Sequence, residues 1–414
     1  MRSSDLDTVI IGAGTGGLCL AHGLRKGGLK VRVFERDRTP TSRLFGYRLN
    51  IGPAGNHALR ECLPAENFDR LVAASAKSST AVSFLNHKLD RLLTINHPEV
   101  DRASIRSERP IGRLALRQVL LRGLEDVVQF DQTFAGYTET DDGRVSVGFE
   151  DGSSTLCDVL VGADGAGSRV CKQLLPQARR MDTGIQVLSG KLPLDAVARR
   201  QTPEAAFRGP TLIMGPRGCF MFLSAVEHPP ELRARTEEDT QDYVMWGFSA
   251  RRESLGDITD ERLDGEQARQ AVLAQMHDWE PALRWLIEHA DVSTFSRFAV
   301  KSAAPVSPWP TRRITLLGDA LHNMTPYRGV GANMALRDAE ALSRVLVNVA
   351  NGQTRLLAAL SGYEQEMIRT GFAAVKASLS NMHRVHSTSP VEKAVRNTMF
   401  RVVNAVPLLQ PMWR

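Results

Sequence analysis

The chain has 414 residues, of which 43% are hydrophobic and 24% are charged, a balance typical of a folded protein with a sizeable core rather than of a disordered chain. Its 52 Lys and Arg outnumber its 46 Asp and Glu, which gives a net charge of +6, but the basic residues are scattered in short pairs. We therefore expect no nucleic-acid partner and no polybasic membrane tether, whereas a mild positive field would attract anionic cofactors.

The five cysteines are odd in number and have neither zinc nor redox spacing, which favours reduced, packed thiols and no metal site. The sequence contains no stretch of 18 apolar residues and no recognisable secretory signal. We therefore expect a cytoplasmic chain without a transmembrane segment, present as a monomer or a weak dimer.

The first forty residues predict a strand, a glycine-rich turn, a helix and a second strand. Thr8 to Ile11 is a short apolar run of the kind buried on both faces of a parallel sheet. The turn follows over residues 12–17, apolar residues then recur at helical spacing until Gly27-Gly28, and Lys30 to Phe34 alternates as a second strand. This order predicts a βαβ unit.

Further elements follow along the chain. Residues 53–75 and 111–124 predict helices, and residues 81–85 and 89–95 predict a hairpin. Strands are predicted within 127–157 and over 158–163, 187–192, 211–214, 218–226, 243–249 and 313–317, with helices over 278–289 and 332–348. The last sixty residues are helical and basic. We expect their amphipathic segment from Val391 to Val406 to cover the nucleotide-binding domain rather than to lie on a membrane or a partner.

This pattern predicts an α/β fold in which a Rossmann-like nucleotide-binding domain is interrupted by a second domain with a mixed β-sheet. The expected nucleotide-binding domain comprises residues 1–79, 100–178 and 296–350. The expected substrate-binding domain comprises residues 80–99 and 179–295, and residues 351–414 form C-terminal helices.

The glycine turn has the spacing G-x-G-x-x-G at Gly12, Gly14 and Gly17. The first glycine permits a tight turn, the second lets a diphosphate approach the backbone, and the third allows close packing of the helix. The helix amides would then face the diphosphate. Glu35 ends the second strand, where a carboxylate can accept hydrogen bonds from a ribose diol and would repel a 2′-phosphate. The pocket therefore suits the ADP part of FAD or NAD better than that of NADP.

Two further motifs accompany this turn. The second runs from Asp158 to Gly165 and is followed by Ser168-Arg169-Val170. The third runs from Leu317 to His322 and is followed by Pro326, Gly329, Gly331, Asn333 and Asp338-Ala339. Together the three motifs resemble the single-component, FAD-dependent aromatic hydroxylases, the class A flavoprotein monooxygenases related to salicylate and tetracycline hydroxylases. The resemblance covers roughly residues 5–350 and implies a glutathione-reductase type of FAD-binding domain.

The motifs and the resemblance together give a set of expected cofactor-binding residues. From the residues themselves, Asp319 ends a buried strand where it can accept from a ribityl or ribose hydroxyl, and the turn at 329–333 opens a long helix whose amides can face the flavin. The resemblance implies the same placement and adds the arginines, Asn50 and Asp164. The full set is Gly12, Gly14, Thr15, Gly16, Gly17, Glu35, Arg36, Arg43, Asn50, Arg113, Arg117, Asp164, Asp319, Pro326, Gly329, Val330, Gly331, Ala332 and Asn333.

Three positions depart from the family pattern. Val330 stands where the family often has Gln, Cys171 where many relatives have Arg, and Asn50 where close relatives commonly have a carboxylate. The resemblance implies a monooxygenase that takes electrons from NADPH or NADH, reacts with O2 to form a flavin 4a-hydroperoxide, and hydroxylates or epoxidises an aromatic or unsaturated small molecule such as a secondary metabolite. The flavin would carry this chemistry, so no catalytic side chain is assigned.

Candidate substrate contacts are Arg48, Met214, Phe220, Phe222, Trp246, Phe248 and Tyr327. For the apolar strand residues, ordinary core packing is at least as good an interpretation, and for Tyr327 an exposed loop role is equally good. Arg48 could orient an anionic substrate or bind the flavin, and a surface salt bridge is the alternative. For His322 we favour a structural hydrogen bond to backbone over a contact with FAD or substrate. Two other functions stay open: a flavin-dependent reductase or oxidase of the same fold, and a non-enzymatic binding protein, which intact flavin motifs disfavour.

Overall fold

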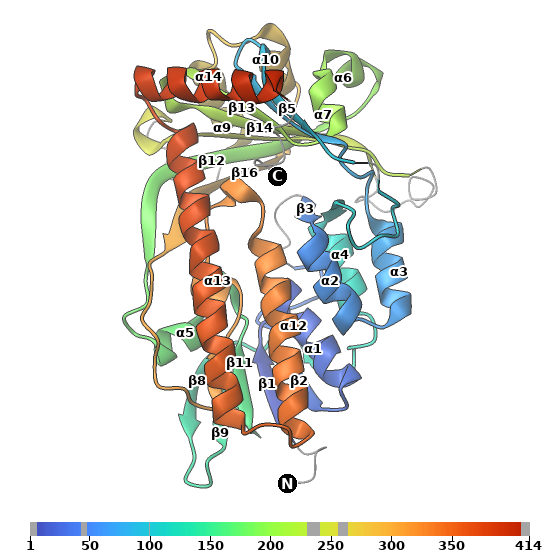
Figure 1. Ribbon diagram of the computed structural model, residues 1–414, viewed down its shortest axis with the longest axis vertical. Coiled ribbons are helices and arrows are strands. Elements are labelled where there is room, and N and C mark those ends of the chain that lie inside the picture. The colour runs from blue at the N-terminus through green and yellow to red at the C-terminus, as the bar shows by residue number, and fades with distance from the viewer. Residues whose placement is uncertain (1–5, 43–47, 99, 230–240, 256–263, 407–414) are drawn as a thin grey trace.

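The computed structural model describes residues 6–42, 48–98, 100–229, 241–255 and 264–406. Its lower half in Figure 1 contains a five-stranded parallel sheet in the order β17-β11-β1-β2-β7. The strands are β1 (Asp7–Ile11), β2 (Lys30–Phe34), β7 (Val128–Gln129), β11 (Val159–Gly162) and β17 (Ile314–Leu316). Every residue of β1 is buried, as its apolar run predicts. The predicted βαβ unit and the Rossmann-like core are thereby confirmed.

Helices pack on this parallel sheet, and α1 (Thr15–Lys26) contacts α12 (Gly331–Ala350) along much of its length. The predicted helix over 53–75 is two helices, α2 (Pro53–Cys62) and α3 (Ala65–Ala74), because Pro64 lacks the N–H that a continuous helix needs. The predicted helix over 111–124 starts only at α4 (Arg113–Leu121). The residues before it form a strand, β6 (Arg109–Gly112), which pairs with β3 (Arg48–Ile51).

A seven-stranded mixed sheet forms the upper half, in the order β16-β12-β15-β14-β13-β4-β5 (Figure 1). Its strands are β4 (Ala81–Asn86), β5 (Arg91–Asn96), β12 (Arg180–Pro193), β13 (Thr211–Met214), β14 (Phe220–Val226), β15 (Tyr243–Arg251) and β16 (Asp291–Ala303). Only β4 and β13 pair in parallel. One face packs against the helices α6 (Ala196–Gln201), α7 (Glu204–Arg208), α9 (Gly265–Gln275) and α10 (Pro281–Glu288). The other face is turned toward the parallel sheet.

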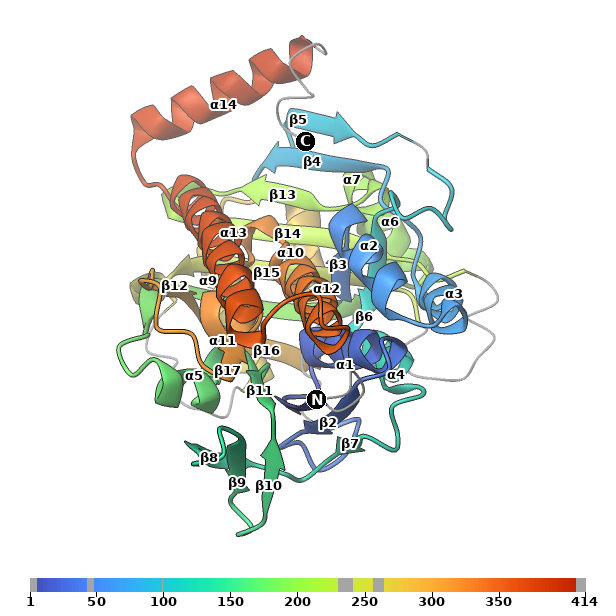
Figure 2. The same ribbon diagram turned by 60° about the horizontal axis from the view of Figure 1, so that its bottom comes forward.

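The remaining elements surround these two sheets. A three-stranded antiparallel sheet comprises β8 (Phe134–Glu139), β9 (Val145–Phe149) and β10 (Ser154–Cys157), and two short helices are α5 (Arg169–Leu174) and α11 (Asp319–His322). The long helix α13 (Leu356–Val385) lies beside α12 in both views (Figures 1 and 2). No helix among the described residues has both the length and the apolar character needed to cross a bilayer.

The last helix, α14 (Pro390–Ala405), lies on the edge of the seven-stranded sheet and not on the nucleotide-binding part, so the expectation for this segment is wrong. The Phe400 ring packs against that of Phe84 of β4, with the centroids 4.8 Å apart and the rings tilted by 49°. Asn404 Oδ1 accepts the amide of Thr94 at 3.0 Å. The outer face of α14 exposes Val391, Val395, Met399 and Val402, and Val406 directly after the helix is exposed as well.

Candidate active site

In the glycine turn between β1 and α1, some glycines are required by close packing and another leaves space for a ligand. Gly12 has a φ of +111°, and a Cβ added there would lie 2.4 Å from the Ala163 carbonyl oxygen. A Cβ on Gly17 would lie 2.1 Å from the Gly12 carbonyl oxygen. Gly14, in contrast, has no atom within 4 Å of an added Cβ and lines a pocket. The third glycine is thus needed for packing, and the second leaves space for a ligand.

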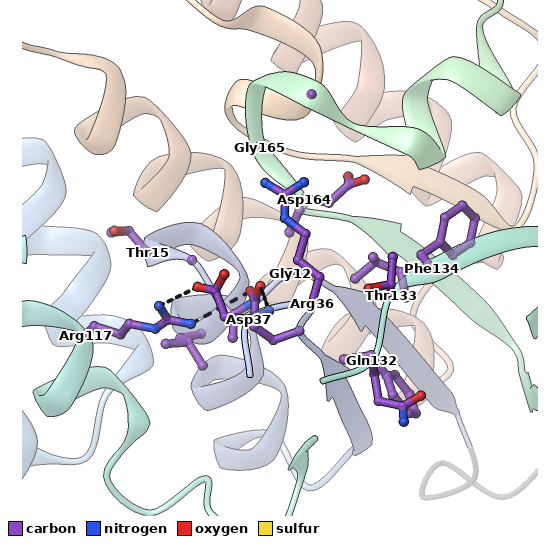
Figure 3. A pocket seen from close by; sticks show the side chains of 18 of the residues that line it. Gly12, Thr15, Arg36, Asp37, Arg117, Gln132, Thr133, Phe134, Asp164 and Gly165 are labelled. Carbon is purple, nitrogen blue, oxygen red and sulfur yellow. Dashed lines mark hydrogen bonds and ion pairs between the residues drawn. The ribbon is translucent and has the colours of Figure 1, made fainter. Parts of the chain in front are cut away.

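This pocket has a volume of about 310 Å³ and opens over the start of α1 (Figure 3). Eight expected cofactor-binding residues line it: Gly12, Gly14, Thr15, Glu35, Arg36, Arg113, Arg117 and Asp164. Lining residues that the sequence did not single out include Asp37, Gln132, Thr133 and Phe134, and Arg169 of the second motif lines the pocket although it was not assigned to cofactor binding. Gly16 and Gly17 are buried in the first turn of α1 and do not line it, and Arg43 lies outside the described residues.

Carboxylates and an arginine meet at the end of β2. Glu35 Oε2 accepts the amide of Ala13 at 2.7 Å, and Glu35 Oε1 accepts the amide of Asp37 at 2.9 Å. Arg117 of α4 donates to Asp37 Oδ2 at 3.0 Å and lies 4.0 Å from Glu35 Oε2 (Figure 3). Glu35 therefore ties the glycine turn to β2 at the place where a ribose would lie. Asp37 could have been noticed in the sequence because it follows the Phe34-Glu35-Arg36 motif by one residue.

Asp164 stands at the end of β11 and braces the next helix. Its Oδ2 atom accepts the amide of Arg169 at 2.7 Å, at the start of α5. Its Oδ1 atom is buried and has no hydrogen-bond partner within the described part of the chain. A buried acceptor without a donor is costly, so a ligand that brings a donor to this wall of the pocket would be favoured.

Asp319, Arg113 and the start of α12 lie near one another beyond the glycine turn, and we call the region between them the cofactor cleft. Both side chains are exposed to solvent, yet surrounding protein desolvates them. Desolvation raises the pKa of Asp319, opposed by the charges of His322, Arg113 and Arg180 and by a hydrogen bond from Asn323. Desolvation also lowers the pKa of Arg113, opposed by the charge of Asp319. The carboxylate and the guanidinium are thus both accessible to a ligand, both surrounded by protein, and close enough for their charges to interact.

The N-terminus of α12 borders the same cleft. Pro326 begins a 3-10 turn (Pro326–Arg328), and Gly329 has a φ of +63°, which brings Val330 and Gly331 to the start of the helix. A Cβ added at Gly331 would lie 4.0 Å from Asp319 Oδ1, so this turn lies next to Asp319. The amides of Gly331, Ala332 and Asn333 precede the first intrahelical bond and are available to a ligand.

The side chain of Asn333 is occupied by the protein itself. Its Oδ1 atom accepts the amide of Gly52 at 2.9 Å, and its Nδ2 atom donates to the Asn50 carbonyl oxygen at 2.9 Å. Asn50 in turn donates through Nδ2 to Glu108 Oε2 at 2.5 Å. Burial raises the pKa of Glu108, opposed by this hydrogen bond. Asn333 thus joins the start of α12 to β3, so its backbone alone is free to face a cofactor.

The sequence analysis favoured a hydrogen bond from His322 to backbone, but His322 pairs with a side chain instead. Its Nε2 atom lies 2.6 Å from Asp338 Oδ2, which also accepts the amide of Gly318 at 2.9 Å, and the imidazole is fully buried. Burial lowers the pKa of His322, but the Asp338 carboxylate outweighs it, so the pKa is raised overall. This pair fixes the turn that carries Asp319 against α12.

The expected substrate contacts divide between the two faces of the seven-stranded sheet. Met214, Phe220 and Phe222 share the face turned toward the parallel sheet and pack near Tyr327. Trp246 and Phe248 lie on the opposite face, fully buried in the core beneath α9 and α10, so their assignment as substrate contacts is wrong. Strand residues alternate between faces, and register places both with Leu223 and Met221 rather than with Phe222.

Tyr327 and Arg48 reach this inner face from other elements. Tyr327 donates its hydroxyl to His386 Nε2 at 2.6 Å, because His386 Nδ1 must donate to the Gly218 carbonyl oxygen at 2.7 Å. Arg48 donates through Nη2 to Ser224 Oγ of β14 at 2.9 Å. Both residues therefore lie between the cofactor cleft and the sheet.

The pocket and the cleft fit a dinucleotide. Gly14 leaves open a space that a Cβ would fill, and the first turn of α1 contains no acidic residue. The buried Asp164 Oδ1 atom has no hydrogen-bond donor in the described part of the chain. The pocket also carries Arg36, Arg117 and Arg169. Together these features favour an anionic group with hydroxyl donors at the helix N-terminus, as a nucleotide diphosphate provides.

Comparisons with known proteins agree with this geometry. Residues 121–378 match the family described as FAD binding domain, and residues 10–71 match the NAD(P)-binding Rossmann-like domain. A dual O-methyltransferase/FAD-dependent monooxygenase of Phaeosphaeria nodorum is 33% identical over 377 residues, which cover 83% of this chain and 40% of that protein. The chain thus spans less than half the length of that curated relative.

Two further relatives match over nearly their whole length. The 3-hydroxybenzoate 6-hydroxylase of Polaromonas naphthalenivorans is 28% identical over 410 residues, which cover 96% of this chain and 92% of that protein. The crystal structure of a protein assigned as an FAD-containing monooxygenase from Photorhabdus luminescens has a TM-score of 0.82 at 34% identity, and the match covers 92% of this chain and 98% of that chain. The chain therefore belongs to the class A flavoprotein monooxygenases, the FAD-dependent aromatic hydroxylases that its three motifs resemble.

Proposed function

We propose that this chain binds FAD and, with NADH or NADPH as reductant, inserts one atom of O2 into an aromatic or unsaturated small molecule. The observation that carries the proposal is the pocket at Gly14, which is lined by Glu35 and also by Arg113, whose charge interacts with that of Asp319 beside the start of α12. Two electrons come from the nicotinamide, one oxygen atom enters the product and the other leaves as water. The bound FAD supplies this redox chemistry.

The chain's own residues would hold FAD at two ends. Glu35 and Arg117 lie where the adenosine ribose would bind, and the amides at the start of α1 would receive the diphosphate. Asp319 would accept a hydroxyl of the ribityl chain, and Arg113 would offset negative charge in the cleft. The amides of Gly331, Ala332 and Asn333 would face the end of the flavin ring where negative charge develops on reduction.

The seven-stranded sheet would supply the substrate side. Phe222 of β14 and Tyr327 of the turn before α12 present aromatic surface between the sheet and the cleft. Such a wall would bind a planar, apolar substrate and exclude water from the reacting atoms. One relative is named for the hydroxylation of an aromatic acid, 3-hydroxybenzoate, which supports an aromatic substrate here.

The decisive experiment uses the FAD-loaded protein with a collection of aromatic and unsaturated compounds. We expect some compounds to accelerate oxidation of NADH or NADPH and their products to gain one oxygen atom that carries label from ¹⁸O2. A product that is reduced or dehydrogenated without label would favour the alternative, a flavin-dependent reductase or oxidase of the same fold. A colourless protein that cannot take up FAD would instead support a non-enzymatic binding role.

We also propose that the chain acts in the cytoplasm as a monomer or a weak dimer, without a nucleic-acid partner. All five cysteines are free and buried, which fits a reducing compartment. Sedimentation across a hundredfold range of protein concentration would measure the oligomeric state. A dimer that persists at the lowest concentration would contradict this part of the proposal.

A further inference from the structure

Arg48 is held at the boundary between the cofactor cleft and the substrate sheet. It lies opposite Gly112 in the β3–β6 pair, and the next residue along, Arg113, faces Asp319 in the cleft. From β3 the Arg48 side chain reaches across to Ser224 of β14, with a hydrogen bond of 2.9 Å. Phe222 precedes Ser224 by two residues on the same face, and Met245 pairs with Ser224 on the neighbouring strand. The guanidinium therefore lies beside a half-buried apolar surface. The strand residue that pairs with Arg48 directly precedes Arg113 of the proposed flavin site.

This guanidinium has no negative partner in the described part of the chain. Its hydrogen bond there is to the neutral hydroxyl of Ser224, and no carboxylate forms an ion pair with it. The carboxyl of Glu108, on the adjoining β6 segment, is bonded to Asn50 instead. Burial lowers the pKa of Arg48, opposed by the charge of Tyr243. A partly buried cation without a counter-ion is costly, so its retention calls for a ligand that supplies the negative charge.

We propose that Arg48, oriented by its hydrogen bond to the buried Ser224, binds an anionic oxygen of the substrate, a carboxylate or a phenolate, while the aromatic ring packs against Phe222 and Met245. This inference rests on the proposed function, because it takes the inner face of the seven-stranded sheet as the substrate site. It narrows that function from aromatic or unsaturated molecules in general to aromatic acids and ionised hydroxyaromatics. Arg48 is then the residue that decides specificity for charge.

The test measures binding to the FAD-loaded protein without reductant, so it does not depend on oxygen chemistry. The probes are 2-naphthoate and 3-hydroxy-2-naphthoate, each compared with its neutral amide by isothermal titration calorimetry. We expect the wild-type protein to bind each acid roughly tenfold to hundredfold more tightly than its amide, as a charge-assisted hydrogen bond gives. Arg48→Met should abolish this preference by weakening the acids alone, and Arg48→Lys should restore part of it.

Two further measurements separate the substrate role from other roles of Arg48. If the guanidinium served FAD, Arg48→Met would weaken FAD binding, whereas we expect unchanged FAD affinity. If it only fastened the β3–β6 pair to the sheet, Arg48→Met would lower the melting temperature of the ligand-free protein. We expect an equal or higher melting temperature, since an uncompensated charge is removed.

A matched control is Arg355→Met, which removes the same charge at an exposed position before α13. It should leave both affinities unchanged. Equal binding of acid and amide by the wild-type protein, no binding of either acid, or an acid preference that survives in Arg48→Met would overturn the inference. Failure of the proposed monooxygenation would appear separately, as unlabelled product in the oxygen assay with the acid preference intact.

Discussion

Replacement of Gly14 by alanine tests whether the glycine turn is a ligand cradle or merely a tight turn. The backbone at Gly14 has a φ of −83° and a ψ of −176°, which any residue adopts, and an added Cβ meets no atom within 4 Å. Alanine reduces the backbone freedom of the unfolded chain, which stabilises the variant, but it is a weaker N-cap than glycine, which destabilises it. Each effect changes the free energy of unfolding by about 1 kcal/mol or less. The stability of the FAD-free protein should therefore change by less than about 1 kcal/mol.

FAD binding should respond quite differently, because the new methyl group fills the space next to the first amides of α1. Loss of one or two charge-assisted hydrogen bonds to the diphosphate would weaken binding roughly tenfold to hundredfold. The assay is a titration of FAD-free protein with FAD, followed by quenching of flavin fluorescence, together with urea unfolding of the same samples. Gly17→Ala is the matched comparison, since its Cβ would lie 2.1 Å from the Gly12 carbonyl oxygen and should destabilise the fold itself by about 1–3 kcal/mol. Wild-type FAD affinity in Gly14→Ala, or unfolding as early as in Gly17→Ala, would refute the reasoning.

Three other changes probe the remaining parts of the site. Asp319→Ala should lose FAD on purification, measured as flavin per chain, and full flavin content would show that the assignment is wrong. Glu35→Gln should keep the fold, because an amide oxygen can still accept from Ala13, but should bind FAD roughly tenfold more weakly, and unchanged affinity would exclude a ribose contact. Burial lowers the pKa of His386 to about 4, so the unfolded chain binds more protons between pH 4 and 6.5 and stability falls as the pH drops through that window. Urea unfolding should show a loss of about 2 kcal/mol from pH 8 to pH 5 that His386→Gln lacks, and identical pH profiles would contradict it.

The sequence predicted those parts of the fold that local patterns determine. The strand over Thr8–Ile11, the glycine turn and the strand ending before Glu35 lie where they were expected, because each is specified by residues adjacent in the chain. The division of the chain into domains remains our proposal. One of its boundaries, at residue 296, falls inside β16 (Asp291–Ala303), which is a continuous strand of the seven-stranded sheet. Composition changes gradually along such a strand and does not mark its end.

The misassigned substrate residues show a different limit. In β15 every residue from Tyr243 to Ala250 is buried or half-buried, so alternation of polar and apolar residues cannot tell which face is which. Only the pairing with β14 decides that Trp246 faces α10 and not the cleft. A strand covered on both sides loses the periodic signal on which such predictions depend.

The side chains that assemble the cofactor cleft were hidden for a further reason, the distance between partners along the sequence. Asn333 forms hydrogen bonds with Gly52 and Asn50, which precede it by 281 and 283 positions. Asp338 accepts hydrogen bonds from the His322 side chain and from the Gly318 amide. One helix, α12, therefore offers its first amides to the proposed flavin and is fixed through its side chains to β3 and to the turn bearing Asp319. The side chains of the motif residues in this helix form hydrogen bonds within the protein, and its first backbone amides would bind the cofactor. Since the same helix end serves both purposes, any change that loosens these side-chain bonds should also misplace the amides, so that flavin affinity reports on the assembly of three distant chain segments.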